Sequence, residues 1–330
     1  MELDSRNASA VVAIGRNEGV RLQMCLRAAL AVSSTVVYVD SGSTDGSAAL
    51  ARMLGCAVVE LDPAQPFTAA RARNEGFQQL MKLAPEIAFV QFVDGDCALD
   101  PVWLEAAVAA LQADAGVAQV RGHLFELHPE QSVYNRLCQL EWLQTPGKIE
   151  VCGGVFLIRA EVYAALGGMR PMIAGEDEEF SLRVRAAGGA ILMLDEYMAT
   201  HDAAITRLRQ WLQRMRRSGY AYAQMAELHP EAVYLGQMRR RVWLWGGVLP
   251  LVAFGLAAVS RGGSLAVMLG LYLLQFAHIA RATRRSGWPQ PDGRVYAFFL
   301  VILRWAVLQG MIEYAWKKFR RRSMCLIEYK

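Results

Sequence analysis

The sequence predicts an α/β fold with a mostly parallel mixed sheet, followed by a helical membrane segment. Three observations support this prediction: short apolar runs alternate with amphipathic stretches over residues 10–120, acidic residues directly follow two of these runs, and long uncharged runs lie near the C-terminus. Apolar strands separated by helices of this length form βαβ units. We therefore expect an α/β domain over 1–230 and a membrane-associated helical region over 231–330.

The elements of the α/β domain can be assigned in chain order from the spacing of their apolar residues. Strands are expected at 10–15, 35–40, 56–61, 87–94, 155–159 and 190–202. Helices are expected at 19–32, 47–55, 69–83, 176–188 and 205–225. The fourth helix starts with acidic residues and ends at a glycine, as the helix dipole and capping favour. Glycines and prolines at 145–147 and 152–154 mark a change of topology.

The C-terminal region contains two uncharged runs, 242–260 and 264–280, separated only by Arg261, Gly262 and Gly263. Each is close to the roughly 20 residues of a membrane-spanning helix, so we expect an antiparallel hairpin. Two buried core helices are the alternative. A third helix, expected at about 295–316, is interrupted by Arg304. It either spans the membrane or forms an interfacial or re-entrant segment with its basic tail on cytoplasmic lipid.

Charge is distributed unevenly along the chain. The net charge is +4, but residues 231–330 contain 15 Lys and Arg against 4 Asp and Glu, which leaves a balance of −7 for residues 1–230. An acidic first part argues against nucleic acid as a partner. Basic clusters at Arg239–Arg241 and at Arg281, Arg284 and Arg285 flank the hairpin and place both its ends in the cytoplasm. We therefore expect membrane lipids as partners.

The cysteines and the N-terminus indicate the compartment. The six cysteines are scattered without a CxxC pair, which favours a reducing compartment over a disulfide framework or a zinc site. The first ten residues, MELDSRNASA, lack the basic and apolar regions of a signal peptide, so none is expected.

Three acidic clusters indicate the chemistry: Asp40 and Asp45 at the end of the second strand, Asp94 and Asp96 at the end of the fourth, and Glu176 with Asp177. Open α/β sheets bind their ligands at the carboxyl ends of their strands. Two acids one residue apart suit a divalent cation, which takes oxygen ligands and is commonly shared with substrate phosphates. The clusters predict metal-assisted chemistry on a phosphorylated substrate.

Five motifs that include these acids resemble glycosyltransferase family 2, the inverting sugar transferases of GT-A fold. In chain order they are VVAIGRNEG, VDSGSTDGS, ARNEG at 72–76, VDGDC and GEDEEFSLRVRAAG. The resemblance covers about residues 1–220. It implies a Rossmann-like GT-A catalytic domain, a nucleoside diphosphate sugar as donor, usually linked to UDP, and Mg²⁺ or Mn²⁺ as cofactor.

The first motifs suggest where the donor binds. Arg16, Asn17 and Glu18 follow the first strand, and Asn17 and Glu18 either cap the next helix or contact the base or ribose. The resemblance implies that Asp40 accepts a hydrogen bond from the base and that Asp94 faces the ribose. It places Arg73 near the base and diphosphate, although Arg71 is an alternative. Asp45 is expected to cap a helix rather than bind a ligand.

The remaining motifs suggest the metal and the base. By resemblance Asp96 binds the cation, and His201 is either a further ligand or a structural residue. Asp177 is the implied general base, with Glu176 as its partner, although Glu178 and Glu179 make the register ambiguous. Such a base removes the proton from the acceptor hydroxyl, which then attacks the anomeric carbon with inversion.

One departure from the family concerns the acceptor. Processive members carry a Q-(Q/R)-x-R-W motif, whereas this chain has Arg at the position of the final Trp in QRMRR, residues 213–217. A processive synthase is therefore disfavoured. Gln213, Arg214 and Arg216 are expected to bind the acceptor or a phosphate, with a solvated helix face as the alternative.

Together these features predict a membrane-anchored, metal-dependent, inverting glycosyltransferase. It is expected to move one sugar to a lipid-linked saccharide acceptor on the cytoplasmic face of a bacterial inner membrane, in cell-surface polysaccharide assembly. A polyprenyl-phosphate glycosyl synthase is the nearer alternative. A non-catalytic membrane scaffold that kept the fold is the other.

Overall fold

A computed structural model describes residues 8–286, 288–289 and 291–320. Some of the residues discussed above lie outside this range: residues 1–7 of the N-terminal stretch in which no signal peptide is expected, Arg321 and Arg322 of the basic tail, and Cys325. Contacts divide the chain into two compact units, residues 1–206 and 207–330.

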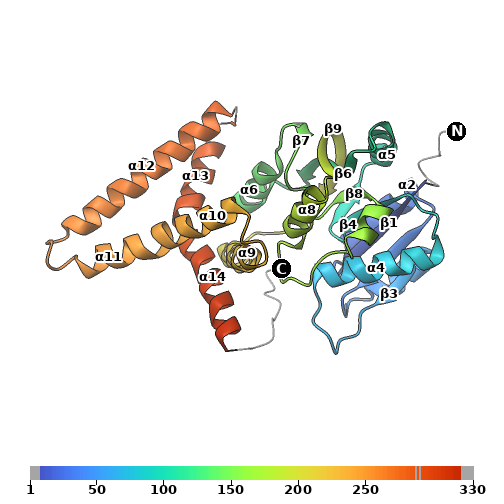
Figure 1. The fold of residues 1–330 in the computed structure, drawn as a ribbon, viewed down its shortest axis with the longest axis horizontal. Helices are drawn as coiled ribbons and strands as arrows, with labels where there is room; N and C mark the ends of the chain where they lie inside the picture. The colour runs from blue at the N-terminus through green and yellow to red at the C-terminus, as the bar shows by residue number, and fades with distance from the viewer. Residues whose placement is uncertain (1–7, 287, 290, 321–330) are drawn as a thin grey trace. The chain divides into compact units, whose positions relative to one another are not determined.

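The first unit contains a mixed sheet with strand order β3-β2-β1-β4-β8-β6-β9-β5, and β7 beside β9 (Figure 1). The strands are β1 Ser9–Gly15, β2 Val36–Asp40, β3 Ala57–Glu60, β4 Phe89–Asp94, β5 Cys97–Leu99, β6 Val117–Glu126, β7 Gly147–Lys148, β8 Phe156–Arg159 and β9 Ala190–His201. Among the described strands, β5, β7 and β8 run in the direction opposite to the others. The carboxyl ends of β1, β2, β4, β6 and β9 therefore share one edge of the sheet. A mostly parallel mixed sheet is confirmed.

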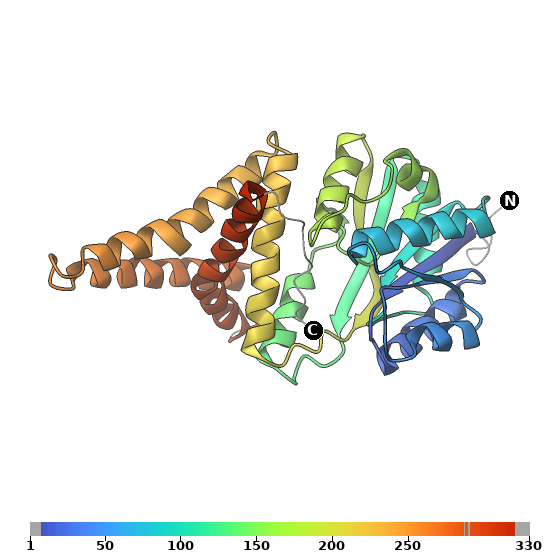
Figure 2. The ribbon, with the colours of Figure 1, turned by 90° about the horizontal axis from the view of Figure 1, so that it is seen from below.

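Helices cover both faces of this sheet. On one face lie α2 (Val20–Val32), α3 (Ser47–Met53) and α5 (Trp103–Ala113). On the other lie α4 (Ala69–Leu83), α7 (Ala160–Ala165) and α8 (Glu176–Ala186). Figure 2 shows α4 in cyan opposite α2 and α3 in blue. Strand β1 serves both cores because alternate residues point to opposite faces: Val11 and Ala13 to the first, and Ala10, Val12 and Ile14 to the second.

Helix α4 approaches the sheet closely because of one glycine. A Cβ added at Gly76 would lie 2.4 Å from Val12 Cγ1 and 2.8 Å from Val39 Cγ2. Since α4 begins near the carboxyl edge of the sheet and sits this close, its early residue Arg73 reaches that edge while remaining buried.

The expected strands and helices of the first unit are present, with α4 at the predicted bounds of 69–83. No element was assigned between residues 95 and 144, where the structure has β5, α5, β6 and α6 (Val133–Trp142). These elements supply the middle of the sheet and one of its edges.

The second unit is helical. It contains α9 Leu208–Leu228, α10 Val233–Trp243, the π-helical turn η1 Leu244–Val248, α11 Leu249–Gly255, α12 Gly263–Arg285, α13 Asp292–Ile302 and α14 Arg304–Phe319. Contacts group α9 with these helices, whereas the predicted first domain extends to residue 230. The packing of α9 on α14 explains the grouping: a Cβ at Gly219 would lie 1.9 Å from Val307 O, and one at Gly310 would lie 2.0 Å from Arg216 O.

The expected hairpin corresponds to the run α10–η1–α11 followed by α12. Its first arm starts before the predicted residue 242 and ends at Gly255 instead of 260, while α12 extends past the predicted 280 to Arg285. The single helix predicted over 295–316 is wrong: α13 and α14 meet at a 40° bend next to Arg304, the residue that interrupts the apolar run. By length and composition, α12 is the one described helix able to cross a membrane, and the bent pair α13–α14 would be a second if counted as one span.

Candidate active site

Arg73 connects two of the three acidic clusters. Its guanidinium donates to Asp94 Oδ1 at 2.7 Å through one terminal nitrogen and to Glu176 Oε1 at 2.8 Å through the other. Arg73 is only 2% exposed. Burial lowers the pKa of Arg73, but Asp94, Glu176 and Asp177 outweigh this effect and raise it overall. The arginine is therefore a permanent cation that holds the end of β4 beside the start of α8.

A glycine on the far side of the ion pairs makes them possible. A Cβ at Gly154 would lie 2.8 Å from the Arg73 NH2 nitrogen and 3.0 Å from Asp94 Oδ2. Arg71, the alternative to Arg73, instead pairs with Glu75 at 2.7 Å and donates to the carbonyls of Asp62 and Gln65. The structure thus brings Arg73, not Arg71, to the acidic clusters.

Asp177 differs from the acids around it. Burial, followed by the neighbouring Glu176 carboxylate, raises its pKa to about 6, although Arg73 opposes the shift. Its carboxylate forms no ion pair with any residue in the described part of the chain. A half-buried carboxylate with a pKa near neutrality can accept a proton at physiological pH.

Glu179, a further acid in the first turn of α8, has structural partners. Glu179 is fully buried and pairs with Arg183 at 3.0 Å and with Arg170 at 3.1 Å. Arg183 also donates to the carbonyls of Leu166 and Gly168. These contacts assign Glu179 to the packing of α8. Glu176 and Asp177 are the first-turn acids that interact with Arg73.

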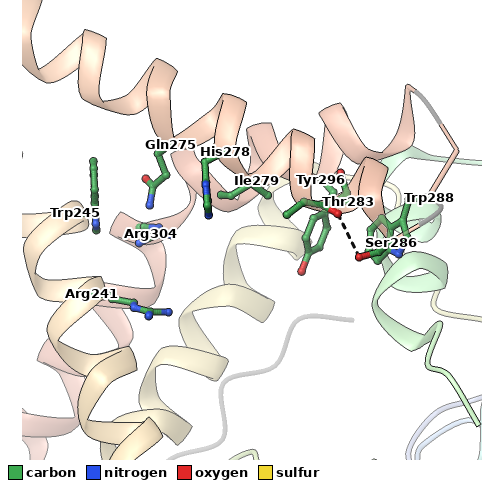
Figure 3. Close-up of a pocket in the computed structure, with 11 residues that line it drawn as sticks. Arg241, Trp245, Gln275, His278, Ile279, Thr283, Ser286, Trp288, Tyr296 and Arg304 are labelled. Carbon is green, nitrogen blue, oxygen red and sulfur yellow. Dashed lines mark hydrogen bonds between the residues drawn. The ribbon is translucent and has the colours of Figure 1, made fainter.

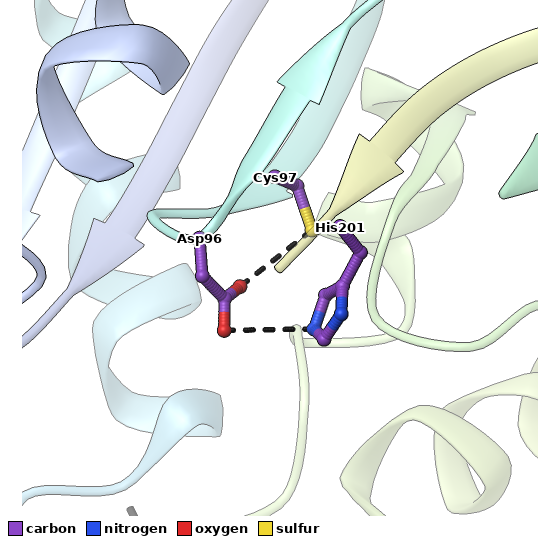
Figure 4. Close-up of side chains that lie close together, drawn as sticks. All are labelled: Asp96, Cys97 and His201. Atoms are coloured by element: carbon purple, nitrogen blue, oxygen red, sulfur yellow. Dashed lines mark hydrogen bonds and ion pairs between the residues drawn. The ribbon is translucent and has the colours of Figure 1, made fainter. Parts of the chain in front are cut away.

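A second cluster, at the ends of β4, β5 and β9, joins Asp96, Cys97 and His201 (Figure 4). Their ligand atoms lie within 4.8 Å of one another, and His201 Nε2 is 3.5 Å from Asp96 Oδ2. Antiparallel pairing of β5 with β9 places Cys97 opposite His201. The Cys97 thiol donates to Asp96 Oδ1 at 3.6 Å and its pKa is raised by burial, so it serves Asp96 as a neutral donor.

Glu126 is a residue that the sequence analysis did not identify. It ends β6 and is paired in register with His201 of β9, whose Nδ1 lies 3.4 Å from Glu126 Oε2. The buried Glu126 carboxylate also accepts from the amide of Ala203 at 3.1 Å. A histidine that donates Nδ1–H to a carboxylate presents the lone pair of Nε2 on its other side. His201 and Asp96 then offer two electron-pair donors to the same space, a donor set that fits a cation such as Mn²⁺.

The loop after β1 and the turn after β2 are bound to each other. Asn17 Oδ1 accepts from the amide of Thr44 at 2.7 Å, and the amide of Asn17 donates to Ser43 Oγ at 2.9 Å. Asp40 is buried at the end of β2, where it accepts from the amides of Gly42 and Ser43. The side chains of Asn17 and Asp40 thus shape the loops at the carboxyl edge.

Other residues of these loops have distinct contacts. Asp45 accepts from the amide of Gly19 at 3.0 Å and from that of Ser47 at 3.1 Å, but the N-cap of α3 is Gly46, so Asp45 lies one residue before the capping position that was expected for it. Glu18 pairs with Arg21 at 2.7 Å. The Arg16 guanidinium lies over the Phe67 ring, 5.4 Å from its centroid.

Arg121 of β6 is a further residue that the motifs did not indicate. It is 5% exposed and forms no ion pair with the residues that the structure describes. Burial lowers the pKa of Arg121, and Cys152 and Asp177 oppose that effect. Arg121 is thus a buried cation without a carboxylate partner, and it lies close enough to Asp177 for that residue to affect the pKa of Arg121. Such a cation favours the binding of an anion in this part of the unit.

The residues expected at the acceptor lie in the second unit, on α9. Gln213, Arg214 and Arg216 are half-buried. Arg214 lies over Trp211 at 5.1 Å, and Arg216 pairs with Glu313 of α14 at 2.6 Å. A phosphate at Arg216 would therefore share the guanidinium with a carboxylate.

Comparison with known proteins identifies the family. The sequence profile described as glycosyltransferase like family 2 matches residues 7–221. A curated relative, the glycosyltransferase AglE of Haloferax volcanii, is 26% identical over 201 residues, which cover 57% of this chain and 64% of AglE. The match thus spans less than two thirds of that relative.

Solved structures show the same fold. The mannosyltransferase PcManGT from Pyrobaculum calidifontis, in complex with GDP-Man and Mn²⁺, is similar with a TM-score of 0.64 and 16% identity, over 94% of this chain and 88% of that one. TarS of S. aureus, residues 1–349, is similar with a TM-score of 0.50 and 15% identity, over 92% of this chain and 91% of that one. The predicted GT-A fold is confirmed.

Proposed function

The chain belongs to glycosyltransferase like family 2, and we propose that it transfers a single sugar from a nucleoside diphosphate sugar to a lipid-linked saccharide. The observation that carries the proposal is the contact of Arg73 with Asp94 and Glu176. It supports a catalytic centre in which a donor held at the end of β4 faces a base at the start of α8.

In this proposal Asp96 and His201 hold the divalent cation, with Glu126 orienting the imidazole. When bound, the cation supplies Lewis-acid stabilisation of the charge on the leaving diphosphate. The nitrogen ligand favours Mn²⁺ over Mg²⁺, which prefers oxygen ligands throughout. PcManGT was solved with Mn²⁺, in agreement with this choice.

Asp177 is the proposed general base. Its raised pKa of about 6 leaves it ionised at pH 7 yet basic enough to take the proton of an acceptor hydroxyl. The hydroxyl oxygen then attacks the anomeric carbon from the face opposite the leaving phosphate, which inverts the configuration. Glu176 is bound to Arg73, and its negative charge helps to raise the pKa of Asp177.

The donor nucleotide is proposed to bind over the loops after β1 and β2. Asp40 and Asn17 are held by backbone contacts, so their orientation does not depend on the donor. Asp40 is proposed to accept from the base, Arg16 and Glu18 to border the site, and Asp94 to face the ribose. UDP sugars are the first donors to test, and GDP sugars the second, since PcManGT was solved with GDP-Man.

The helical unit is the proposed membrane anchor, with the catalytic unit on the cytoplasmic side of a bacterial inner membrane. The large exposed apolar side chains of α11 and α12, with Leu251 at 76% and Leu274 at 68%, support an apolar environment. Such an anchor would keep the enzyme near a lipid-linked acceptor and raise its effective concentration. Gln213, Arg214 and Arg216 remain proposed contacts of the acceptor or its phosphate.

One observation favours the alternative of direct transfer to polyprenyl phosphate: the buried cation Arg121 near Asp177 would suit an acceptor phosphate. The two functions differ in their need for a base. A phosphate monoester has a second pKa near 6, so its oxygen is already ionised, whereas a sugar hydroxyl must lose a proton. Asp177→Asn should therefore stop transfer to a hydroxyl but leave transfer to a lipid phosphate largely intact.

The experiment that tests the proposal measures nucleotide release and sugar transfer by the detergent-purified chain with lipid extracts as the acceptor source. Transfer that requires a pre-glycosylated lipid supports the proposed function. Transfer to bare polyprenyl phosphate supports the synthase. The scaffold would be supported if the chain bound nucleotide but turned over no donor with any acceptor, and if Asp177→Asn bound nucleotide equally well.

A further inference from the structure

The helical unit contains a cavity of about 500 Å³ between α10, α12, α13 and α14 (Figure 3). This volume lies in the range of ordinary small-ligand sites, roughly 300–1,000 Å³. The cavity lies entirely within the second unit and includes none of the residues assigned to sugar transfer. Its lining combines two arginines with polar and aromatic side chains.

The two arginines give the cavity a positive charge. Arg241 projects from α10 and Arg304 from α14, and among the described residues that line the cavity none is acidic. The Arg241 side chain forms no hydrogen bond or ion pair with any residue that the structure describes. Two like charges facing one cavity repel each other, and an anion between them would remove that repulsion.

Neutral partners hold Arg304 without cancelling its charge. When the Gln275 amide is oriented with its oxygen toward Arg304, that oxygen accepts from the two terminal nitrogens of the guanidinium at 2.8 and 3.2 Å. The guanidinium also lies over the Trp245 ring, 5.9 Å from the centroid. His278 points from α12 toward the side on which Arg241 and Arg304 lie (Figure 3). The arginine is thus positioned in advance, as a site for a planar or tetrahedral anion requires.

The surroundings of the cavity select the kind of anion. The helix that supplies Gln275 and His278 is α12, the helix long and apolar enough to cross a membrane, and its neighbouring residues Leu273 and Leu274 are exposed. Trp288 and Tyr296, two further lining residues, are of the types enriched where membrane meets water. Basic pockets between membrane helices bind phosphorylated lipid headgroups.

We propose that this cavity binds the phosphate headgroup of an anionic membrane lipid, with Arg241 and Arg304 as its ligands and the lipid chains along α12. The proposal goes beyond the proposed sugar transfer and does not depend on it. A free phosphate has the same charge but no chains to contact the exposed leucines of α12, so the two sources can be separated by experiment.

The test is displacement of a fluorescent short-chain phosphatidic acid from the full chain in dodecyl maltoside, without donor or metal. The competitors are unlabelled phosphatidic acid, diacylglycerol with the same chains, and inorganic phosphate. We expect phosphatidic acid to compete at least about tenfold better than either other competitor, because diacylglycerol lacks the phosphate and inorganic phosphate lacks the chains. Equal competition by diacylglycerol would overturn the phosphate site, and equal competition by inorganic phosphate would overturn the lipid.

Matched variants locate the site. Arg241→Gln changes an exposed side chain that has no hydrogen-bond or ion-pair partner among the described residues, so the variant should fold normally. We expect it to weaken phosphatidic acid binding about tenfold. Arg304→Gln should have a similar effect. The control is Arg281→Gln, an equal change of charge on the exposed surface of α12 outside the cavity. An equal loss in the control would overturn the proposal in favour of general surface charge.

A catalytically impaired chain separates this inference from the proposed function. Asp96→Ala should abolish sugar transfer yet bind phosphatidic acid as the unmodified chain does, since Asp96 lies in the other unit. If Asp96→Ala binds normally while no sugar donor is ever found, the lipid site stands and the proposed function fails. If transfer is established while Arg241→Gln binds lipid normally, the lipid site fails alone.

Discussion

The Arg73 guanidinium lies 2.8 Å from the Glu176 carboxylate although 103 residues separate them in the chain. The same guanidinium contacts Asp94 at 2.7 Å. One buried cation therefore fixes the distance between the strand end that carries Asp94 and Asp96 and the helix start that carries Asp177. This relationship underlies the account of sugar transfer.

Replacing this cation should destabilise the protein. Arg73→Ala leaves two carboxylates without their counter-charge, and breaking a buried ion pair costs about 3–5 kcal/mol. The matched control is Arg71→Ala on the same helix, where a surface pair with Glu75 is worth at most about 1 kcal/mol. Urea unfolding of the two variants measures the difference. Equal destabilisation would show that Arg73 has no special role.

The raised pKa of Asp177 predicts how the transfer rate depends on pH. The base works only when ionised, so activity should fall as the pH drops through about 6. At pH 5 the rate should be about tenfold below its value at pH 7, as one pKa unit of protonation implies. A pH series of kcat/KM with saturating metal measures this. A profile that stays flat from pH 5 to 8 would exclude Asp177 as the base.

The Glu126–His201 contact predicts the strength of metal binding. Glu126→Gln should weaken Mn²⁺ binding by about 10–100-fold, the usual effect of removing a carboxylate that orients a histidine ligand. Isothermal titration with Mn²⁺ alone measures the affinity without any turnover. His128→Ala, at a partly exposed histidine near the end of β6, is the control and should bind Mn²⁺ normally. Unchanged affinity in Glu126→Gln would assign Glu126 to packing only.

The close contact of α9 with α14 predicts opposite effects of two glycine substitutions. Gly219→Ala places a methyl group against the carbonyl of Val307 and should destabilise the helical unit by about 1–3 kcal/mol. Gly236→Ala, on α10 with nothing within 4 Å of the added methyl, should instead stabilise it by about 0.5–1 kcal/mol. Thermal unfolding in detergent distinguishes them. Two shifts of the same sign would contradict the close packing of α9 on α14.

The sequence predicted the parts of the site that local patterns encode. Asp40 and Asp94 were identified because each follows an apolar strand, and the structure places both at strand ends. Glu126 also ends a strand, but β6 was not recognised, and its contact with His201 depends on the pairing of β6 with β9, 75 residues later. The choice between Arg71 and Arg73 likewise required the packing of α4, which Gly76 controls. Long-range pairing, not local propensity, decided these residues.

The most direct test of the account is release of nucleoside diphosphate from a panel of UDP and GDP sugars by the detergent-purified chain, with Mn²⁺ and lipid extract. We predict release from one donor, lost with EDTA and with Asp96→Ala, and reduced about 10²–10⁴-fold in Asp177→Asn. Release that survives both substitutions, or no release from any donor by a chain that also fails to bind UDP and GDP, would contradict it.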